Sequence, residues 1–170
     1  GSDTYVFSKG HGQDIVSDQG NYTENATDTI KFTDVNSTEV KFAIDGKNLI
    51  VFGYNGSDKI TIENFLSLTY EIERFQFADK TITLDDYWRN GLPLYVQDDA
   101  ESTINGWAGA NHIQTGSGNH TIIAQHTREK PANDIVRLGS GNNTVQLNFG
   151  NSTIYDGTGN NKLTGGHGNT

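Results

Sequence analysis

Apolar residues recur every nine positions through the last 74 residues of the chain. A small residue stands four positions before each of them, and every step is nine residues except one of fourteen; the apolar positions are Ile104, Ile113, Ile122, Val136, Val145, Ile154 and Leu163. Such a repeat indicates short stacked strands, each burying one apolar side chain against the next coil. Residues 92–170 are therefore predicted to form a parallel β-solenoid in which each nonapeptide is a six-residue turn and a three-residue strand.

The single fourteen-residue step interrupts this period with five extra residues around Ala124–Arg128. Solenoids accept insertions in loops on one face. These residues are predicted to form a surface bulge between coils.

The hydrophobic period changes to two in the first half of the chain. Val40, Phe42 and Ile44 alternate with polar residues, and Asp45-Gly46 then indicates a tight turn into a second apolar run. Similar runs continue to Thr81–Leu84, which predicts an antiparallel meander closed by a short helical turn from Asp85. A boundary near residue 91 divides the chain into predicted domains 1–91 and 92–170.

Three aspartates near the N-terminus share one local pattern. Asp3, Asp14 and Asp28 each follow a small residue by two positions and precede a β-favouring residue by two. Asp18 lies close enough in sequence to join them. Carboxylates in turns between short strands are candidate ligands for Ca²⁺, and the alternative is that they are ordinary solvated turn residues.

Composition and charge narrow the function classes. The chain has 20 Gly, 2 Pro, no Cys and a net charge of -9. Residues 1–105 carry a net charge of -10 and residues 106–170 carry +1. Acidity argues against nucleic acid and anionic membrane surfaces, the lack of Cys excludes disulfides and thiol catalysis, and no apolar run approaches the roughly 18 residues of a transmembrane span.

The glycine-rich turns resemble those of a known family. Gly116-Ser117-Gly118, Gly139-Ser140-Gly141 and Gly157-Thr158-Gly159 follow the RTX nonapeptide pattern, which implies a parallel β-roll holding Ca²⁺ between its turns. The segments around Asp3, Asp14 and Asp28, with Phe75–Asp79, resemble the haemolysin-type calcium-binding-related module that flanks such rolls. The resemblance implies an all-β chain, with that module and its antiparallel meander preceding a parallel β-roll (β-solenoid) of degenerate nonapeptide repeats.

The family binds Ca²⁺ through an aspartate at the sixth repeat position, and this chain has largely lost it. The sixth positions are Ser102, Asn111, His120, Asp134, Asn143, Ser152, Asn161 and Thr170. Only Asp134 is a carboxylate, and a lone one is often a turn residue. Because affinity depends on charged ligands, calcium is predicted mainly in the N-terminal half and is doubtful in the roll. Asparagines at the fifth position are predicted to form neutral ladders that hold the turns instead. The predicted metal ligands are Asp3, Asp14, Asp18, Asp28 and Asp134.

The resemblance also implies a setting for the chain. It suggests a non-catalytic, calcium-linked folding module of a secreted toxin or adhesin, exported by type I secretion to the extracellular space or bacterial surface. Its expected partners are calcium and neighbouring repeats of a larger parent, because the last repeat stops partway. Two alternatives are a module that binds glycans or host surfaces and a carrier for a secreted hydrolase or epimerase.

Two further features complete the prediction. The histidines, among them His112, His120 and His126, lack the spacing of a zinc site and are expected at the surface or in turns. Asn-x-Ser/Thr triplets begin at Asn21, Asn25, Asn36, Asn55, Asn119, Asn142 and Asn151. Roughly three would arise by chance, so the excess suggests glycosylation; the alternative is that a solenoid rich in Asn and Thr produces the triplet by itself.

Overall fold

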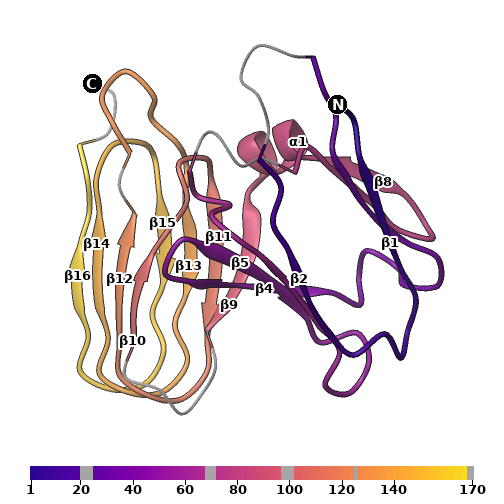
Figure 1. Ribbon diagram of the computed structural model, residues 1–170. Coiled ribbons are helices and arrows are strands. Elements are labelled where there is room, and N and C mark those ends of the chain that lie inside the picture. The colour runs from indigo at the N-terminus through magenta and orange to yellow at the C-terminus, as the bar shows by residue number, and fades with distance from the viewer. Residues whose placement is uncertain (20–24, 68–71, 97–101, 125, 168–170) are drawn as a thin grey trace. The chain divides into compact units, whose positions relative to one another are not determined.

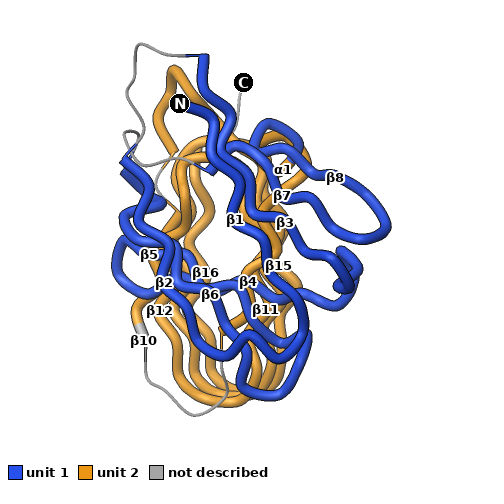
Figure 2. Tube along the Cα trace, turned by 45° about the vertical axis from the view of Figure 1, so that its right-hand side comes forward, with its two compact units in different colours: residues 1–86 blue, residues 87–170 orange. Residues whose placement is uncertain are grey.

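The computed structural model describes residues 1–19, 25–67, 72–96, 102–124 and 126–167 (Figure 1). The triplet at Asn21 and the start of the last repeat at Gly168 lie outside these residues. The chain divides into two compact units, Gly1–Asp86 and Tyr87–Thr170 (Figure 2). Within the described residues, no helix has the length and apolar character needed to cross a bilayer.

The first unit is built from two groups of short strands. One group has the order β1-β3-β7-β8 and the other has the order β4-β5-β6-β2. The strands are β1 (Thr4–Phe7), β2 (Gln13–Val16), β3 (Thr29–Phe32), β4 (Lys41–Asp45), β5 (Asn48–Phe52), β6 (Lys59–Ile62), β7 (Arg74–Gln76) and β8 (Thr81–Thr83). Side chains such as Ile30, Phe42 and Phe75 are fully buried in this unit, so both groups contribute to its core.

The meander is confirmed for part of its predicted length. β4, β5 and β6 pair antiparallel in succession, as the alternating pattern and the Asp45-Gly46 turn predicted. The prediction of one continuous meander to residue 84 is wrong, because β7 and β8 form a hairpin in the other group. β7 pairs in parallel with β3, and β6 with β2. Alternation shows that a segment is a strand, but parallel partners distant in sequence decide where it pairs.

A short helix, α1 (Leu84–Asn90), follows β8 across the division between the units. Thr83 and Asp86 cap its start reciprocally: Asp86 Oδ2 accepts the Thr83 N–H at 2.9 Å, and Thr83 Oγ1 accepts the Asp86 N–H at 3.1 Å. These bonds satisfy backbone donors that the first helical turn leaves unpaired. The helical turn predicted from Asp85 is confirmed.

The second unit is a parallel β-roll (Figure 2). Its strands alternate between one row in the order β9-β11-β13-β15 and a sheet in the order β10-β12-β14-β16. They are β9 (Leu92–Val96), β10 (Ser102–Asn105), β11 (Asn111–Thr115), β12 (His120–Ala124), β13 (Ile135–Arg137), β14 (Thr144–Leu147), β15 (Thr153–Tyr155) and β16 (Lys162–Thr164). All pairings among them are parallel. The predicted fold class, an all-β chain with a β-roll of nonapeptide repeats, is confirmed.

The nine-residue period sets the register of the roll. Ile104, Ile122, Val145 and Leu163 stack in one sheet, and Ile113, Val136 and Ile154 stack in the other row. Ile122, Val136 and Val145 are fully buried, whereas Leu163 in the last strand is 42% exposed. Burial of these side chains therefore depends on the neighbouring coils, as expected of a solenoid.

The five-residue insertion differs from its prediction. Thr127 and Arg128 are exposed, as expected of a surface bulge, but Ala124 ends β12 in the core opposite Leu147. His126 is also buried, at 4% exposure, and so is His120 in β12, at 2%. The histidines were expected at the surface or in turns. His126 lies in the connection between β12 and β13 but is buried, and His120 is buried at the start of β12, so neither lies at the surface. The insertion therefore contributes to the interior of the roll.

Candidate metal centre

Three aspartates of the first unit converge at one end of its parallel strands. β1 and β3 pair in register, with Thr4 opposite Thr29. Asp3 and Asp28 immediately precede these residues, so the parallel pairing places them side by side. The Asp3 N–H donates to Asp28 Oδ1 at 2.7 Å, which fixes the orientation of the Asp28 carboxylate.

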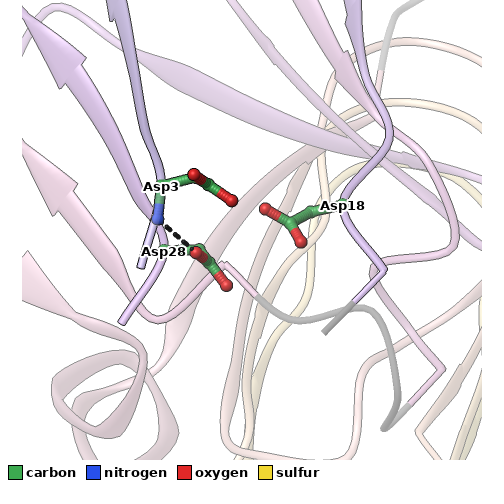
Figure 3. Close-up of side chains that lie close together, drawn as sticks. All are labelled: Asp3, Asp18 and Asp28. Atoms are coloured by element: carbon green, nitrogen blue, oxygen red, sulfur yellow. Dashed lines mark hydrogen bonds between the residues drawn. The ribbon is translucent and has the colours of Figure 1, made fainter. Parts of the chain in front are cut away.

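Asp18 completes the group from the segment that follows β2. One carboxylate oxygen from each of Asp3, Asp18 and Asp28 lies within 4.8 Å of the others. The three carboxylates face a common space (Figure 3). Asp28 is 1% exposed and Asp18 is 9% exposed, while Asp3 lies at the surface. We call Asp3, Asp18 and Asp28 the aspartate cluster.

Neighbouring residues hold the aspartate cluster in place by hydrogen bonds. Burial and mutual repulsion make it unfavourable for all three carboxylates to be charged. The Tyr5 hydroxyl donates to Asp18 Oδ2 at 2.9 Å, and the Asp28 N–H donates to Glu73 Oε2 at 2.6 Å. Burial raises the pKa of Asp18, and the charges of Asp28 and Asp3 raise it further against the opposing Tyr5 hydrogen bond. Burial and the hydrogen bond to Asp18 raise the pKa of Tyr5 to about 12. Three carboxylates this close repel one another unless a cation or a proton separates their charges.

Such an arrangement suits a hard divalent cation. Ca²⁺ takes six to eight oxygen ligands at about 2.3–2.6 Å, so oxygens separated by up to roughly twice that distance can share one ion. The separations within the aspartate cluster fall in this range. Asp3 and Asp28 directly precede the paired strands β1 and β3, and Asp18 follows β2, which pairs with β6, so the paired backbone positions all three residues.

Asp14 occupies a different environment. It lies in β2, and its Oδ2 contacts His11 Nδ1 at 2.5 Å. His11 Nε2 in turn contacts the Tyr54 hydroxyl at 2.7 Å. Calcium binding by Asp14 stays a prediction, with its carboxylate engaged by an imidazole.

Asp58 has a structural role that the sequence did not indicate. This side chain is 6% exposed and accepts the N–H groups of Gly10 at 2.6 Å and Gly12 at 3.0 Å, together with Asn55 Nδ2 at 2.8 Å. The Asn55 hydrogen bond and those from the two glycines lower the pKa of Asp58. Asn55 to Asp58 reads as a turn in the sequence, but nothing local indicates that it closes a loop nearly fifty residues away.

The only acidic sixth position of the roll is already occupied by protein groups. Asp134 is 1% exposed; its Oδ1 accepts the Asn111 N–H at 2.9 Å and Asn111 Nδ2 at 3.0 Å. Its Oδ2 contacts His126 Nε2 at 2.8 Å. Calcium binding at Asp134 stays a prediction, and the buried imidazole from the insertion now accounts for the second carboxylate oxygen.

Neutral amide side chains make further contacts between coils. At the sixth position, Asn143 Oδ1 accepts the His120 N–H at 3.1 Å, and Asn161 Oδ1 accepts the Asn143 N–H at 2.8 Å. At the fifth position, three side-chain oxygens accept backbone N–H groups of the next coil: Asn119 from Asn142 at 2.7 Å, Asn142 from Asn160 at 2.8 Å and Asn133 from Asn151 at 2.9 Å. These bonds, the asparagine ladders, connect successive turns through neutral amides.

Comparison with known families agrees with both halves of this description. The haemolysin-type calcium binding protein related domain matches residues 48–87. The RTX calcium-binding nonapeptide repeat, in four copies, matches residues 100–122 and 147–169. The chain is an RTX calcium-binding repeat protein. Calcium is therefore the ion to consider for this RTX protein, which contains the family's structural repeat.

The residues that match the two families do not include the clustered carboxylates of this RTX protein. The aspartate cluster lies before residue 48, outside both matched families. The repeat match includes Asn111 and Asn161, which are amides at the sixth position. Membership thus identifies calcium as the ion, while the geometry of individual residues indicates where carboxylates are available to it.

Proposed function

We propose that this RTX protein is a non-catalytic structural module whose folding is linked to calcium through the aspartate cluster. The convergence of Asp3, Asp18 and Asp28 carries the proposal, because ion binding relieves the repulsion among three carboxylates that the folded strands bring together. Calcium then stabilises the folded first unit by mass action, since the unfolded chain does not hold the three groups close. The module belongs to a secreted toxin or adhesin in this proposal.

The C-terminal roll has a different role in this proposal. Its turns are held by the asparagine ladders and by the contacts among Asp134, His126 and Asn111, which need no cation. It would therefore stay folded when calcium is low, whereas the first unit would be destabilised. Type I secretion fits this division, because calcium at extracellular levels would complete folding after export.

A calcium titration tests the proposal. Calorimetry on the metal-free chain should show one strong site per chain, and circular dichroism should show chelator lowering the thermal stability of the first unit. Hydrogen exchange in β11–β14 should be the same with calcium and with chelator, because the ladders hold these strands. Loss of protection throughout the roll in chelator would contradict the division of roles.

Replacing Asn143 with aspartate should convert one turn of the roll to calcium dependence. Asn143 is 1% exposed, and its Nδ2 donates to Gly141 O at 3.2 Å and Asn161 Oδ1 at 3.1 Å. A carboxylate cannot donate and would face those two oxygens. The Asn143→Asp variant should lose about 2–3 kcal/mol in chelator, and millimolar Ca²⁺ should restore most of the loss.

Asn160→Asp provides the matched control for this substitution. It adds the same charge at an exposed fifth position, and should change stability by less than about 0.5 kcal/mol in either buffer. Thermal unfolding with chelator and with Ca²⁺ measures both variants. A stable, calcium-insensitive Asn143→Asp protein would show that the turn does not depend on amide donors.

A further inference from the structure

Three asparagines of the roll begin Asn-x-Thr triplets and lie at the fifth repeat position. They are Asn119, Asn142 and Asn151, and all three are exposed. Each stands at the end of a turn: Asn119 immediately precedes β12, and Asn142 and Asn151 lie two residues before β14 and β15. The triplet is the acceptor motif for N-glycosylation, a modification that is bulky and confined to surfaces.

The ladder bonds leave the reactive atom of these residues available. Asn119 Oδ1 and Asn142 Oδ1 each accept one backbone N–H from the next coil. Within the described residues, the Nδ2 atoms of Asn119, Asn142 and Asn151 donate no hydrogen bond. A substituent on Nδ2 leaves Oδ1 free to accept, so modification and the ladder are compatible.

The strand that follows each asparagine directs the third residue of the triplet outward. Thr121 and Thr144 are partly exposed, while the residues on either side of each are buried. They are direct partners in the parallel pair β12 and β14, so their triplets stack in neighbouring coils. Thr153 at the start of β15 is exposed. Strand alternation thus presents hydroxyl and amide on the outside of the roll.

We propose that Asn119, Asn142 and Asn151 are N-glycosylation sites that accept a hexose from a nucleoside-diphosphate sugar. A separate glycosyltransferase would join Nδ2 to the anomeric carbon. The bond from that carbon to the diphosphate oxygen breaks, the nucleoside diphosphate leaves, and the amide loses one proton to a base of the transferase. No oxidation or reduction occurs. The proposal is independent of calcium binding.

Other asparagines in the chain provide internal comparisons. Asn133 and Asn160 occupy the same repeat position and are exposed, but neither is followed two residues later by Ser or Thr. Asn55 begins a triplet, but its Nδ2 donates to Asp58 Oδ2 at 2.8 Å. Within the roll, the structure therefore separates three open sites from two that lack the hydroxyl, and Asn55 of the first unit is a triplet whose amide is occupied.

The test uses the full chain, a purified soluble N-glycosyltransferase specific for Asn-x-Ser/Thr, and UDP-glucose. Peptide mass spectrometry should find one hexose on each of Asn119, Asn142 and Asn151, and none on Asn55, Asn133 or Asn160. Thr144→Val should abolish modification at Asn142 alone, and Thr144→Ser should retain it. Lys162→Thr completes a triplet at Asn160 and should create a fourth site in the roll.

Two readouts distinguish a site from a chance triplet. The modified chain should unfold within about 2 °C of the unmodified chain, because the Oδ1 ladder bonds remain. A loss of β-structure on modification would overturn the proposed geometry. Lack of hexose at all three asparagines, while an Asn-x-Thr peptide in the same tube is modified, would overturn the proposal. Equal modification of the Thr144→Val variant at Asn142 would also overturn it.

Discussion

Alanine at Gly141 should unfold most of the C-terminal roll. A Cβ at this position would lie 2.1 Å from the carbonyl oxygen of Gly118 in the neighbouring coil. The backbone of Gly141 also has a φ of +108°, which L-residues rarely adopt. Neither coil can move away without breaking the parallel pairing of β12 and β14. Steric clash and strain together should cost about 3–5 kcal/mol, a large part of the stability of a small domain.

Gly165→Ala is the matched control for this substitution. An added Cβ there meets nothing within 4 Å, so the variant should unfold within about 1 °C of the original chain. Urea unfolding and hydrogen exchange in β12 and β14 measure the difference. If Gly141→Ala kept full protection in these strands, the close approach of the coils would be wrong.

Asn at position 28 should weaken calcium binding about 100-fold, equivalent to about 2.7 kcal/mol. Asp28 is the most buried member of the aspartate cluster, so solvent compensates least for the loss of its charge. The substitution keeps the shape of the side chain and an oxygen that can accept the Asp3 N–H, so the fold should survive. Calorimetry measures the affinity. Luminescence of bound terbium reports binding at this location, because the Tyr5 ring can sensitise it. The Tyr5 hydroxyl lies 2.9 Å from Asp18 Oδ2.

Asp45→Asn removes the same charge from an exposed residue at the end of β4 and should leave calcium affinity within about twofold. Tyr5→Phe should abolish most terbium luminescence while retaining calcium binding. An Asp28→Asn protein that binds calcium as tightly as the original chain would place the ion elsewhere and remove the basis of the proposed function.

Sequence patterns gave the elements of this protein more reliably than their partners. The period of nine predicted the parallel stacking of Ile122 on Val145, because each repeat adds one strand to the same sheet. The period of two predicted β4, β5 and β6, where tight turns pair each strand with its neighbour in the chain. β7 follows the same period, yet it pairs with β3, more than forty residues earlier. No local signal specifies a partner at that distance.

The same limit applies to the candidate metal centre: local patterns predicted which carboxylates are available, but not which of them come together. Asp3 and Asp28 were predicted as ligands from their shared flanking residues, and Asp18 from its proximity in the sequence. The pairing of β1 with β3 brings Asp3 and Asp28 together, and Asp18 joins them from the segment after β2. Asp14 has the same flanking pattern but contacts His11 instead. The pattern identifies a turn carboxylate, whereas the strand on which it lies decides which groups surround it.

The sequence by itself determined the repeat, its inward apolar residues and its shortage of carboxylates, because each depends only on spacing and residue type. The sequence also predicted neutral asparagine ladders in place of the carboxylates, but the tertiary structure alone decided which groups Asp134 and these asparagines contact. It placed His126 against Asp134, and it aligned the fifth-position asparagines so that each side-chain oxygen meets a backbone N–H of the next coil. These contacts join residues eight to 23 positions apart, and their formation depends on how one coil settles on the next.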